Sequence, residues 1–212
     1  MTKLLVIRHG QSVANLQDIF AGHLDSPLTE LGRKQAEITA EYIAAYYSVD
    51  AVYTSDLCRA AAVGQAVSAA TGAKLTRTES LREIRAGEWE GVEFDDLRRN
   101  WPSFQVWLKD IGNAACDGGE TVAQLQKRII AAVQQIAEDH PEQTVVLTTH
   151  ATAIRVLQCY CEGKPLSQAR DVPWVANTSI TEITYEKGAF SVVRANGTDH
   201  LGNAASTLPA NV

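Results

Sequence analysis

Short apolar runs alternate with stretches of helical apolar spacing, and this alternation constrains the fold more than any other feature of the chain. The segments Lys3 to Ile7 and Thr144 to Thr149 are compact, largely apolar runs, which is typical of strands buried on both faces. Between them, apolar residues recur at helical spacing from Leu31 to Tyr46, with Thr29 as the expected N-cap. Strands that alternate with helices predict a largely parallel sheet covered by helices on both faces.

The remaining predicted elements continue the same rhythm. Further strands are expected at 50–54 and 74–78. Three further helices are expected: one capped by Ser55 or Asp56 and running to about residue 71, one capped by Thr121, and one at 151–161. Two alternating runs, 180–185 and 190–194, flank a short Gly-containing turn and predict a closing hairpin. The predicted fold class is therefore α/β, a three-layer α/β/α sandwich whose mostly parallel sheet has an antiparallel edge.

The domain organisation is expected to be simple. A chain of 212 residues without a linker or repeat predicts one domain over 1–212. Residues 91–119, rich in tryptophan and charge, fall outside the alternation and are predicted to form a small helical cap over one end of the sheet. The residues after Ala195 are small and polar for the most part, and much of this tail is expected to lie irregularly on the surface.

Composition excludes several classes of function. The chain has 25 acidic against 19 basic residues and a net charge of -6, the opposite of what a general nucleic-acid-binding surface needs. No apolar run approaches the roughly 18 residues of a membrane-spanning helix, and Arg8 comes too early for a secretory signal, so a cytoplasmic protein is expected. Neither the four cysteines nor the five histidines have metal-site spacing, so no metal and no cofactor are predicted.

Polar residues follow four of the predicted strands, at the edge where ligands bind in open α/β sheets. Arg8 and His9 end the first run, Arg59 and Glu83 follow the next two strands, and His150 follows the run ending at residue 149. Two arginines and two histidines in an acidic protein predict a pocket for a small anion. Guanidinium forks and the start of a helix at His150 favour phosphate over carboxylate.

These strand ends belong to a larger set of segments that occur in a characteristic order. The segments are LVIRHGQS at 5–12 with Asn15, FAGHLDSPLTELG at 20–32, YTSDLCRA at 53–60, LREI at 81–84, GEWEG at 87–91, GGET at 118–121 and NTS at 177–179. In this order they resemble the histidine phosphatase superfamily, which includes the cofactor-dependent phosphoglycerate mutases. The resemblance spans nearly the whole chain.

The resemblance implies a role for each matching residue. His9 would be the nucleophile that becomes phosphohistidine, and Glu83 would be the general acid and then the general base. An imidazole attacks phosphorus only if its other nitrogen is held as N–H, so an acceptor is expected there, most simply a backbone carbonyl. Alignment and charge neutralisation by arginines need no metal ion. The phosphoryl oxygens would be held by Arg8, Asn15, Arg59, His150 and the main chain of Ala151.

Two positions depart from the family pattern. Ala151 stands where family members usually have glycine, and alanine tolerates a strained backbone less well. Ala21, which with Gly22 is expected beside the substrate, stands where the mutases tend to have threonine.

Several alternatives remain open at the level of sequence. Glu88 and Glu90 compete with Glu83 for the role of general acid, and the aromatic residues of the cap, Trp101, Phe104 and Trp107, fit a pocket wall and a buried helix stripe equally well. The leading hypothesis is a phosphatase for a small phosphorylated metabolite, because residues 84–120 carry four basic against eight acidic side chains and suit a phosphoglycerate poorly. The alternatives are a phosphoglycerate mutase and a non-catalytic phosphate-binding module, as a monomer or a homodimer in each case.

Overall fold

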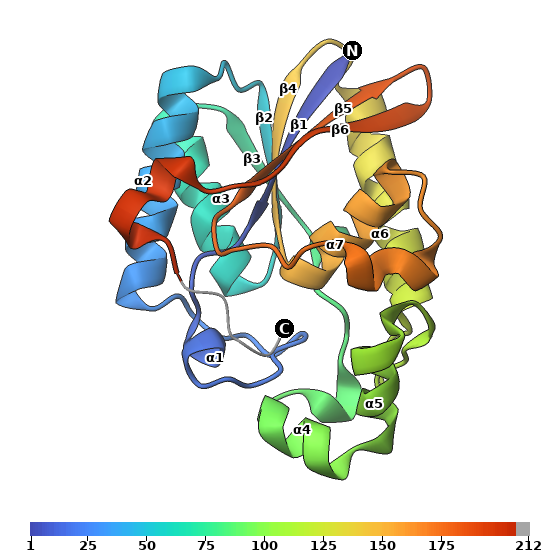
Figure 1. The fold of residues 1–212 in the computed structure, drawn as a ribbon. Coiled ribbons are helices and arrows are strands. Elements are labelled where there is room, and N and C mark those ends of the chain that lie inside the picture. Colours follow the sequence, from blue (N-terminus) through green and yellow to red (C-terminus); the bar gives the residue numbers. More distant parts are fainter. Residues whose placement is uncertain (207–212) are drawn as a thin grey trace.

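A six-stranded sheet forms the centre of the computed structural model, which describes residues 1–206 (Figure 1). The strand order is β3-β2-β4-β1-β5-β6, in which the first four strands are parallel, β5 is antiparallel to β1, and β6 is antiparallel to β5. The predicted α/β fold with an antiparallel edge is confirmed. The strands are β1 (Thr2–Arg8), β2 (Ala51–Ser55), β3 (Lys74–Thr78), β4 (Thr144–Thr149), β5 (Ile180–Glu186) and β6 (Ala189–Gly197).

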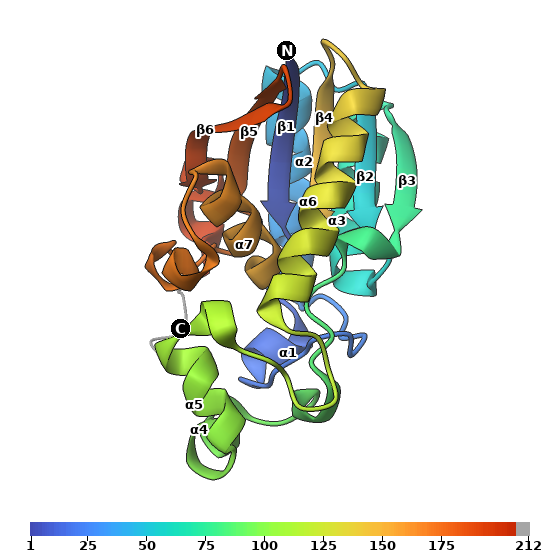
Figure 2. The same ribbon diagram turned by 90° about the vertical axis from the view of Figure 1, so that its right-hand side faces the viewer.

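Helices cover both faces of this sheet, which gives the three predicted layers (Figures 1 and 2). Side chains of β1 alternate between two apolar clusters, as expected of a strand buried on both faces. Leu5 and Ile7 belong to the cluster of α2 and α3, whereas Leu4 and Val6 belong to the cluster of α6 and α7. The four helices are α2 (Glu30–Tyr46), α3 (Cys58–Thr71), α6 (Val122–Asp139) and α7 (Ala151–Cys161).

The helix starts show where local sequence signals held and where one failed. Thr29 caps α2 by accepting a hydrogen bond from the Gly32 N–H, and Thr121 caps α6 in a capping box. The predicted cap of α3 is wrong, because Leu57 is the N-cap and makes no side-chain cap bond. Ser55 instead ends β2 fully buried, where its hydroxyl serves the site described below.

The chain between β3 and α6 crosses below the carboxyl ends of the parallel strands (Figure 2). Two short helices, α4 (Phe94–Asn100) and α5 (Pro102–Lys109), lie within the range predicted for a cap. Phe104 and Trp107 are buried there against Trp89, so the segment has an aromatic centre of its own. We propose that residues 91–119 are a cap inserted into a single domain.

The tail is more ordered than expected up to residue 206. Strand β6 runs to Gly197, and residues 199–204 form a 3-10 helix in which Leu201 and Ala204 are buried. Gln35 of α2 anchors this segment by donating to the Ala204 carbonyl. The prediction of an irregular surface tail is wrong here, and its remainder, 207–212, lies outside the described residues. Within residues 1–206, no helix is both long and apolar enough to cross a bilayer.

Candidate active site

His9 follows β1 and has the orientation that a nucleophilic imidazole needs. Its Nδ1–H donates to the Gly10 carbonyl at 2.7 Å, which leaves the lone pair on Nε2. The side chain is buried, and this burial, followed by the charges of Arg59 and Arg8, holds the pKa of His9 well below its usual range. His9 is therefore neutral, and able to attack, at pH 7.

His150 lies beside it as the N-cap residue of α7. The two ring centroids are 5.2 Å apart, and His150 Nε2 lies 2.9 Å from the hydroxyl of Ser55. Burial, together with the charge of Arg59, also lowers the pKa of His150. Its Nδ1 is buried and has no hydrogen-bond partner within the described part of the chain.

Two buried arginines complete what we call the phosphate end of the site, namely Arg8, His9, Arg59 and His150. Arg8 donates from Nη1 to the Val175 carbonyl, while Arg59 uses Nη1 and Nη2 for carbonyls in the 22–24 turn. The Nε atom of each is buried without a partner, and neither forms an ion pair with any residue of 1–206. Burial lowers the pKa of Arg8 to about 10 and that of Arg59 below its usual value, so both stay charged at pH 7.

The unpartnered donors at this end have a common explanation. Arg8 Nε, Arg59 Nε and His150 Nδ1 are all buried within one cluster around His9. Each buried polar group without a partner costs about 1–3 kcal/mol. A tetrahedral oxyanion with several acceptor oxygens would satisfy all three at once.

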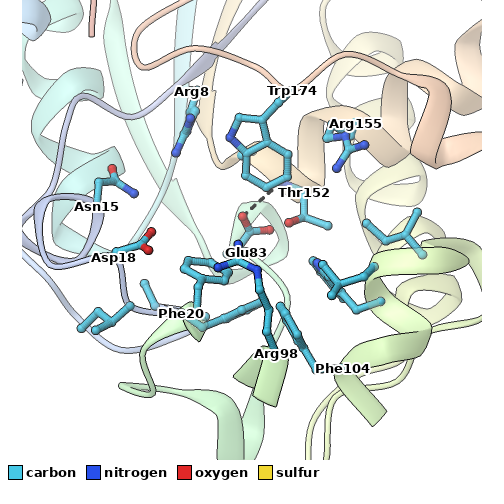
Figure 3. Close-up of a pocket in the computed structure, with 18 of the residues that line it drawn as sticks. Arg8, Asn15, Asp18, Phe20, Glu83, Arg98, Phe104, Thr152, Arg155 and Trp174 are labelled. Atoms are coloured by element: carbon cyan, nitrogen blue, oxygen red, sulfur yellow. Dashed lines mark hydrogen bonds between the residues drawn. The ribbon is translucent and has the colours of Figure 1, made fainter. Parts of the chain in front are cut away.

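Glu83 is held close to this end by backbone donors. Its carboxylate accepts hydrogen bonds from the N–H groups of Ile84 at 3.0 Å and Ala153 at 3.3 Å, and from that of Thr152 at 3.1 Å, which Figure 3 shows as a dashed line. The last two belong to the first turn of α7, whose positive dipole end favours an anion. Of the three glutamates considered for the acid role, Glu83 lines the cavity, whereas Glu88 and Glu90 do not.

Ala151, the residue that departs from the family pattern, starts α7 without strain. Its backbone is helical and is not among the positive-φ positions of the described residues, so a side chain is accommodated there. Thr152 and Ala153 give their N–H groups to Glu83, while Ala151 itself lines the cavity. The main-chain contact that glycine makes in the family remains geometrically open to alanine.

Arg128 of α6, which sequence reasoning missed, fixes the backbone that carries Glu83. Its guanidinium donates to the carbonyls of Ser80, Arg82 and Glu83 at 3.0–3.1 Å. The same guanidinium pairs with Glu120 at 2.8 Å. Glu120 was marked only by its place in the GGET segment, and an arginine within an amphipathic helix gives no sequence signal of this kind.

A cavity of about 220 Å³ opens from the phosphate end toward the cap. Seven of the nine predicted site residues line it, while Arg59 and His150 are fully buried behind its lining. One side of the cavity, which we call the cap wall, is formed by Phe20, Phe94, Phe104 and Trp107. Phe104 and Trp107 are both buried and part of the cavity lining, so they are at once a pocket wall and a buried helix stripe. Trp101 does not line the cavity. The lining residues that sequence reasoning missed include Asp18, Arg98, Thr152, Arg155, Arg170 and Trp174.

Metal-ligand chemistry has no candidate cluster in the described residues. Within 1–206, no three or more histidine, cysteine, aspartate or glutamate side chains gather in a metal-binding group.

Comparison with known proteins agrees with the geometry. The model of the histidine phosphatase superfamily (branch 1) matches residues 4–198. The chain belongs to this superfamily. The chain is 28% identical over 203 residues to phosphoserine phosphatase 1 of Hydrogenobacter thermophilus, and the match covers 95% of each chain. It is also 30% identical to a 2,3-bisphosphoglycerate-dependent phosphoglycerate mutase of Brucella melitensis, over 90% of this chain and 94% of the mutase.

Solved structures agree with this superfamily membership. Bacillus stearothermophilus YhfR superimposes with a TM-score of 0.90 at 31% identity, covering 95% of this chain and 100% of YhfR. The superfamily membership is thus shown, while phosphatases and mutases stand at similar identity among the relatives.

Proposed function

We propose that this histidine phosphatase hydrolyses the phosphomonoester of a small metabolite through a phosphohistidine at His9. The observation that carries the proposal is the set of three buried, unpartnered donors around an imidazole whose Nε2 is free to attack. A phosphoryl group fits this set because it brings several oxygens and a negative charge to one point.

The proposed reaction has two steps. His9 Nε2 attacks phosphorus as the bond to the alcohol oxygen breaks, and protonated Glu83 gives that oxygen its proton. Arg8 and Arg59 neutralise the charge on the remaining oxygens in the transition state, and His150 donates a hydrogen bond to one of them from Nδ1. Glu83, now a carboxylate, then takes a proton from a water that attacks the P–N bond, which releases inorganic phosphate and restores His9.

A phosphoglycerate mutase is the second candidate, and the Brucella relative is the observation in its favour. A mutase keeps water away from its phosphoenzyme and returns the phosphoryl group to a second hydroxyl. The segment between Glu83 and α6 offers this reaction little cationic support, because Arg85 hydrogen-bonds to the Gly118 carbonyl and does not line the cavity.

Two assays test the proposal. Hydrolysis of p-nitrophenyl phosphate is expected in the presence of EDTA, with strong inhibition by vanadate, which resembles five-coordinate phosphorus. In a second assay, 3-phosphoglycerate is supplied with a trace of 2,3-bisphosphoglycerate, and isomerisation is compared with phosphate release. Phosphate release faster than isomerisation supports the phosphatase, and the reverse establishes the mutase. Absence of turnover with both substrates, together with phosphate binding, would instead indicate a binding module.

A further inference from the structure

Arg155 is a buried cation that the proposed reaction does not use. It lies on α7, lines the cavity and is only 8% exposed. Its Nε donates to the Val172 carbonyl at 3.1 Å, and its Nη2 donates to the carbonyls of Ala169 and Arg170. Nη1 has no hydrogen-bond partner, and Arg155 forms no ion pair within the described residues.

The electrostatic position of Arg155 resembles that of the arginines at the phosphate end. Burial lowers its pKa to about 10, as it does for Arg8, and no neighbouring carboxylate offsets the loss of hydration by direct contact. The Trp174 ring, 4.9 Å from the guanidinium carbon, supplies a cation–π contact. Such a contact compensates only part of the cost of burying a charge.

Trp174 connects this arginine to the phosphate end. Its ring centroid is 4.9 Å from the guanidinium carbon of Arg155 and 5.7 Å from that of Arg8, and Figure 3 shows the indole between them. The indole Nε1 is buried without an acceptor in the described part of the chain. Arg8 and Arg155 also line the same cavity, so a single small molecule can contact both arginines. The described cavity lining carries four arginines against Asp18 and Glu83, so it remains cationic beyond the phosphate end.

We propose that Arg155 binds a carboxylate on the alcohol part of the substrate, so that this enzyme prefers phosphomonoesters that carry a carboxylate. The inference rests on the proposed function, because it assigns the phosphate end to the ester being cleaved. A singly charged carboxylate fits better than a second phosphate, because Arg155 has only Nη1 left to donate. The phosphate end offers Arg8, Arg59, His150 and the start of α7 to a dianion.

A matched pair of substrates isolates this contact. 3-Phosphoglycerate and glycerol 3-phosphate share their carbon skeleton and differ in a carboxylate against a hydroxymethyl group. The wild-type enzyme is expected to prefer 3-phosphoglycerate in kcat/KM for phosphate release. Arg155→Gln is expected to reduce that preference about tenfold or more, mainly through KM, because a charge-assisted hydrogen bond is lost.

Two further variants separate charge from scaffolding. Arg155→Lys keeps the cation but loses the fork that holds the 169–172 carbonyls, so it is expected to retain part of the preference. Arg33→Gln is the matched control, because Arg33 also donates to a backbone carbonyl, that of Leu28, and does not line the cavity. Equal losses with both substrates in the two Arg155 variants would show a structural role and overturn the proposal.

Binding to the His9→Ala variant distinguishes this proposal from the proposed function. Calorimetry is expected to show tighter binding of 3-phosphoglycerate than of glycerol 3-phosphate, and Arg155→Gln in the same background is expected to remove the difference. If this binding preference is found but the wild type turns over neither substrate, the proposed phosphatase activity is wrong and the carboxylate site at Arg155 is supported. If the wild type turns over both substrates and the preference does not depend on Arg155, the phosphatase activity is supported and the carboxylate site is wrong. Tighter Arg155-dependent binding of 1,3-propanediol bisphosphate than of 3-phosphoglycerate would overturn the choice of carboxylate.

Discussion

The two ends of the cavity are built in opposite ways. At the phosphate end, Arg8 ends the central strand β1, His9 follows it, and three buried side-chain nitrogens, Arg8 Nε, Arg59 Nε and His150 Nδ1, have no partner in the described residues. At the cap wall, aromatic rings pack mainly on one another, with Phe20 and Trp107 centroids 5.3 Å apart and Phe104 stacked on Trp107. The contrast shows that the phosphate end has donors that a ligand can satisfy, whereas the rings of the cap wall already pack on one another. We propose that the phosphate end carries out the reaction and that the cap wall selects among substrates.

Backbone pairing explains why the phosphate end is precise. Arg8 is in register with Thr149, and the His9 N–H donates to the Thr149 carbonyl at 2.9 Å. On the other side, the Thr178 N–H donates to the carbonyls of Arg8 and His9. Because sheet hydrogen bonds fix this end, substitutions there are expected to reduce the rate, whereas substitutions in the cap wall are expected to change the preference among substrates.

The largest effect is expected for His9→Ala. Removal of the nucleophile is expected to lower kcat for p-nitrophenyl phosphate by about a thousandfold or more. The control is His140→Ala, because His140 hydrogen-bonds Tyr53 and Gln143 and does not line the cavity. Near-normal turnover in the His9 variant would exclude a phosphohistidine at this position.

Arg59→Met is expected to lower kcat/KM about a hundredfold, because one preorganised donor to the transition state is lost. The affinity for vanadate is expected to fall in parallel, which is measured by inhibition at constant substrate. Arg59 also holds the carbonyls of Gly22 and Leu24, so thermal unfolding has to be recorded alongside. An unchanged vanadate affinity in a folded variant would place Arg59 outside the phosphate end.

Arg128→Met is expected to lower kcat about tenfold for an alkyl phosphate and less for p-nitrophenyl phosphate, since p-nitrophenolate leaves without a proton. The reason is that Arg128 acts through Glu83, whose backbone it holds. Arg128→Lys is expected to recover part of the loss, and Lys127→Met, on the exposed neighbouring position, is the control. Equal losses with both leaving groups would mean that Arg128 only stabilises the fold.

The two histidines of the phosphate end make stability depend on pH. Their pKa values are lowered in the folded state, so the unfolded chain binds more protons as the pH falls below about 6.5. The free energy of unfolding is therefore expected to fall between pH 7 and pH 5, by up to about 1.4 kcal/mol per pH unit for each histidine. Urea denaturation of the wild type and of a His9→Ala, His150→Gln double variant checks this, and parallel slopes would contradict it.

The smallest effect is expected in the cap wall. Phe94 is half-buried and its ring centroid lies 5.4 Å from that of Phe20. Phe94→Leu is expected to lower kcat/KM about threefold for an aryl phosphate and to leave glycerol 3-phosphate unchanged, because part of an aromatic contact is lost. A comparable loss with both substrates would mean that the cap wall takes part in the chemistry and that the two ends are not separable.

What could be predicted from the sequence follows the same division. The strand-end rule located His9, Glu83 and Arg59 without any model of side-chain packing, because parallel strands bring their carboxyl ends to one edge. A backbone carbonyl acceptor for the second ring nitrogen of His9 was predicted from the chemistry that a nucleophilic imidazole needs, and the structure provides it in the Gly10 carbonyl. The roles of these residues remain predictions until the variants above are measured.

The missed residues depend on packing between elements. Arg155 and Trp174 meet because α7 packs against the 166–172 segment, and no local pattern shows that contact. Arg128 lies on α6 and donates to three backbone carbonyls of residues 80–83. This contact between distant segments cannot be recognised from the sequence around Arg128. Ser55 was taken for a helix cap, since its sequence neighbourhood does not reveal that His150 lies beside it.

Helix α7 carries both Ala151 and Arg155, which lie four residues apart on one face. A rigid helix rises about 6 Å over that interval, so the separation between the ester and the second charge is set by helix geometry instead of loop conformation. The position of Arg155 along α7 therefore sets the distance between the phosphoester and the second negative charge of a preferred substrate. A variant with its arginine one turn earlier or later on α7 would prefer a shorter or longer substrate. Insertions in the cap would change only the space around the substrate.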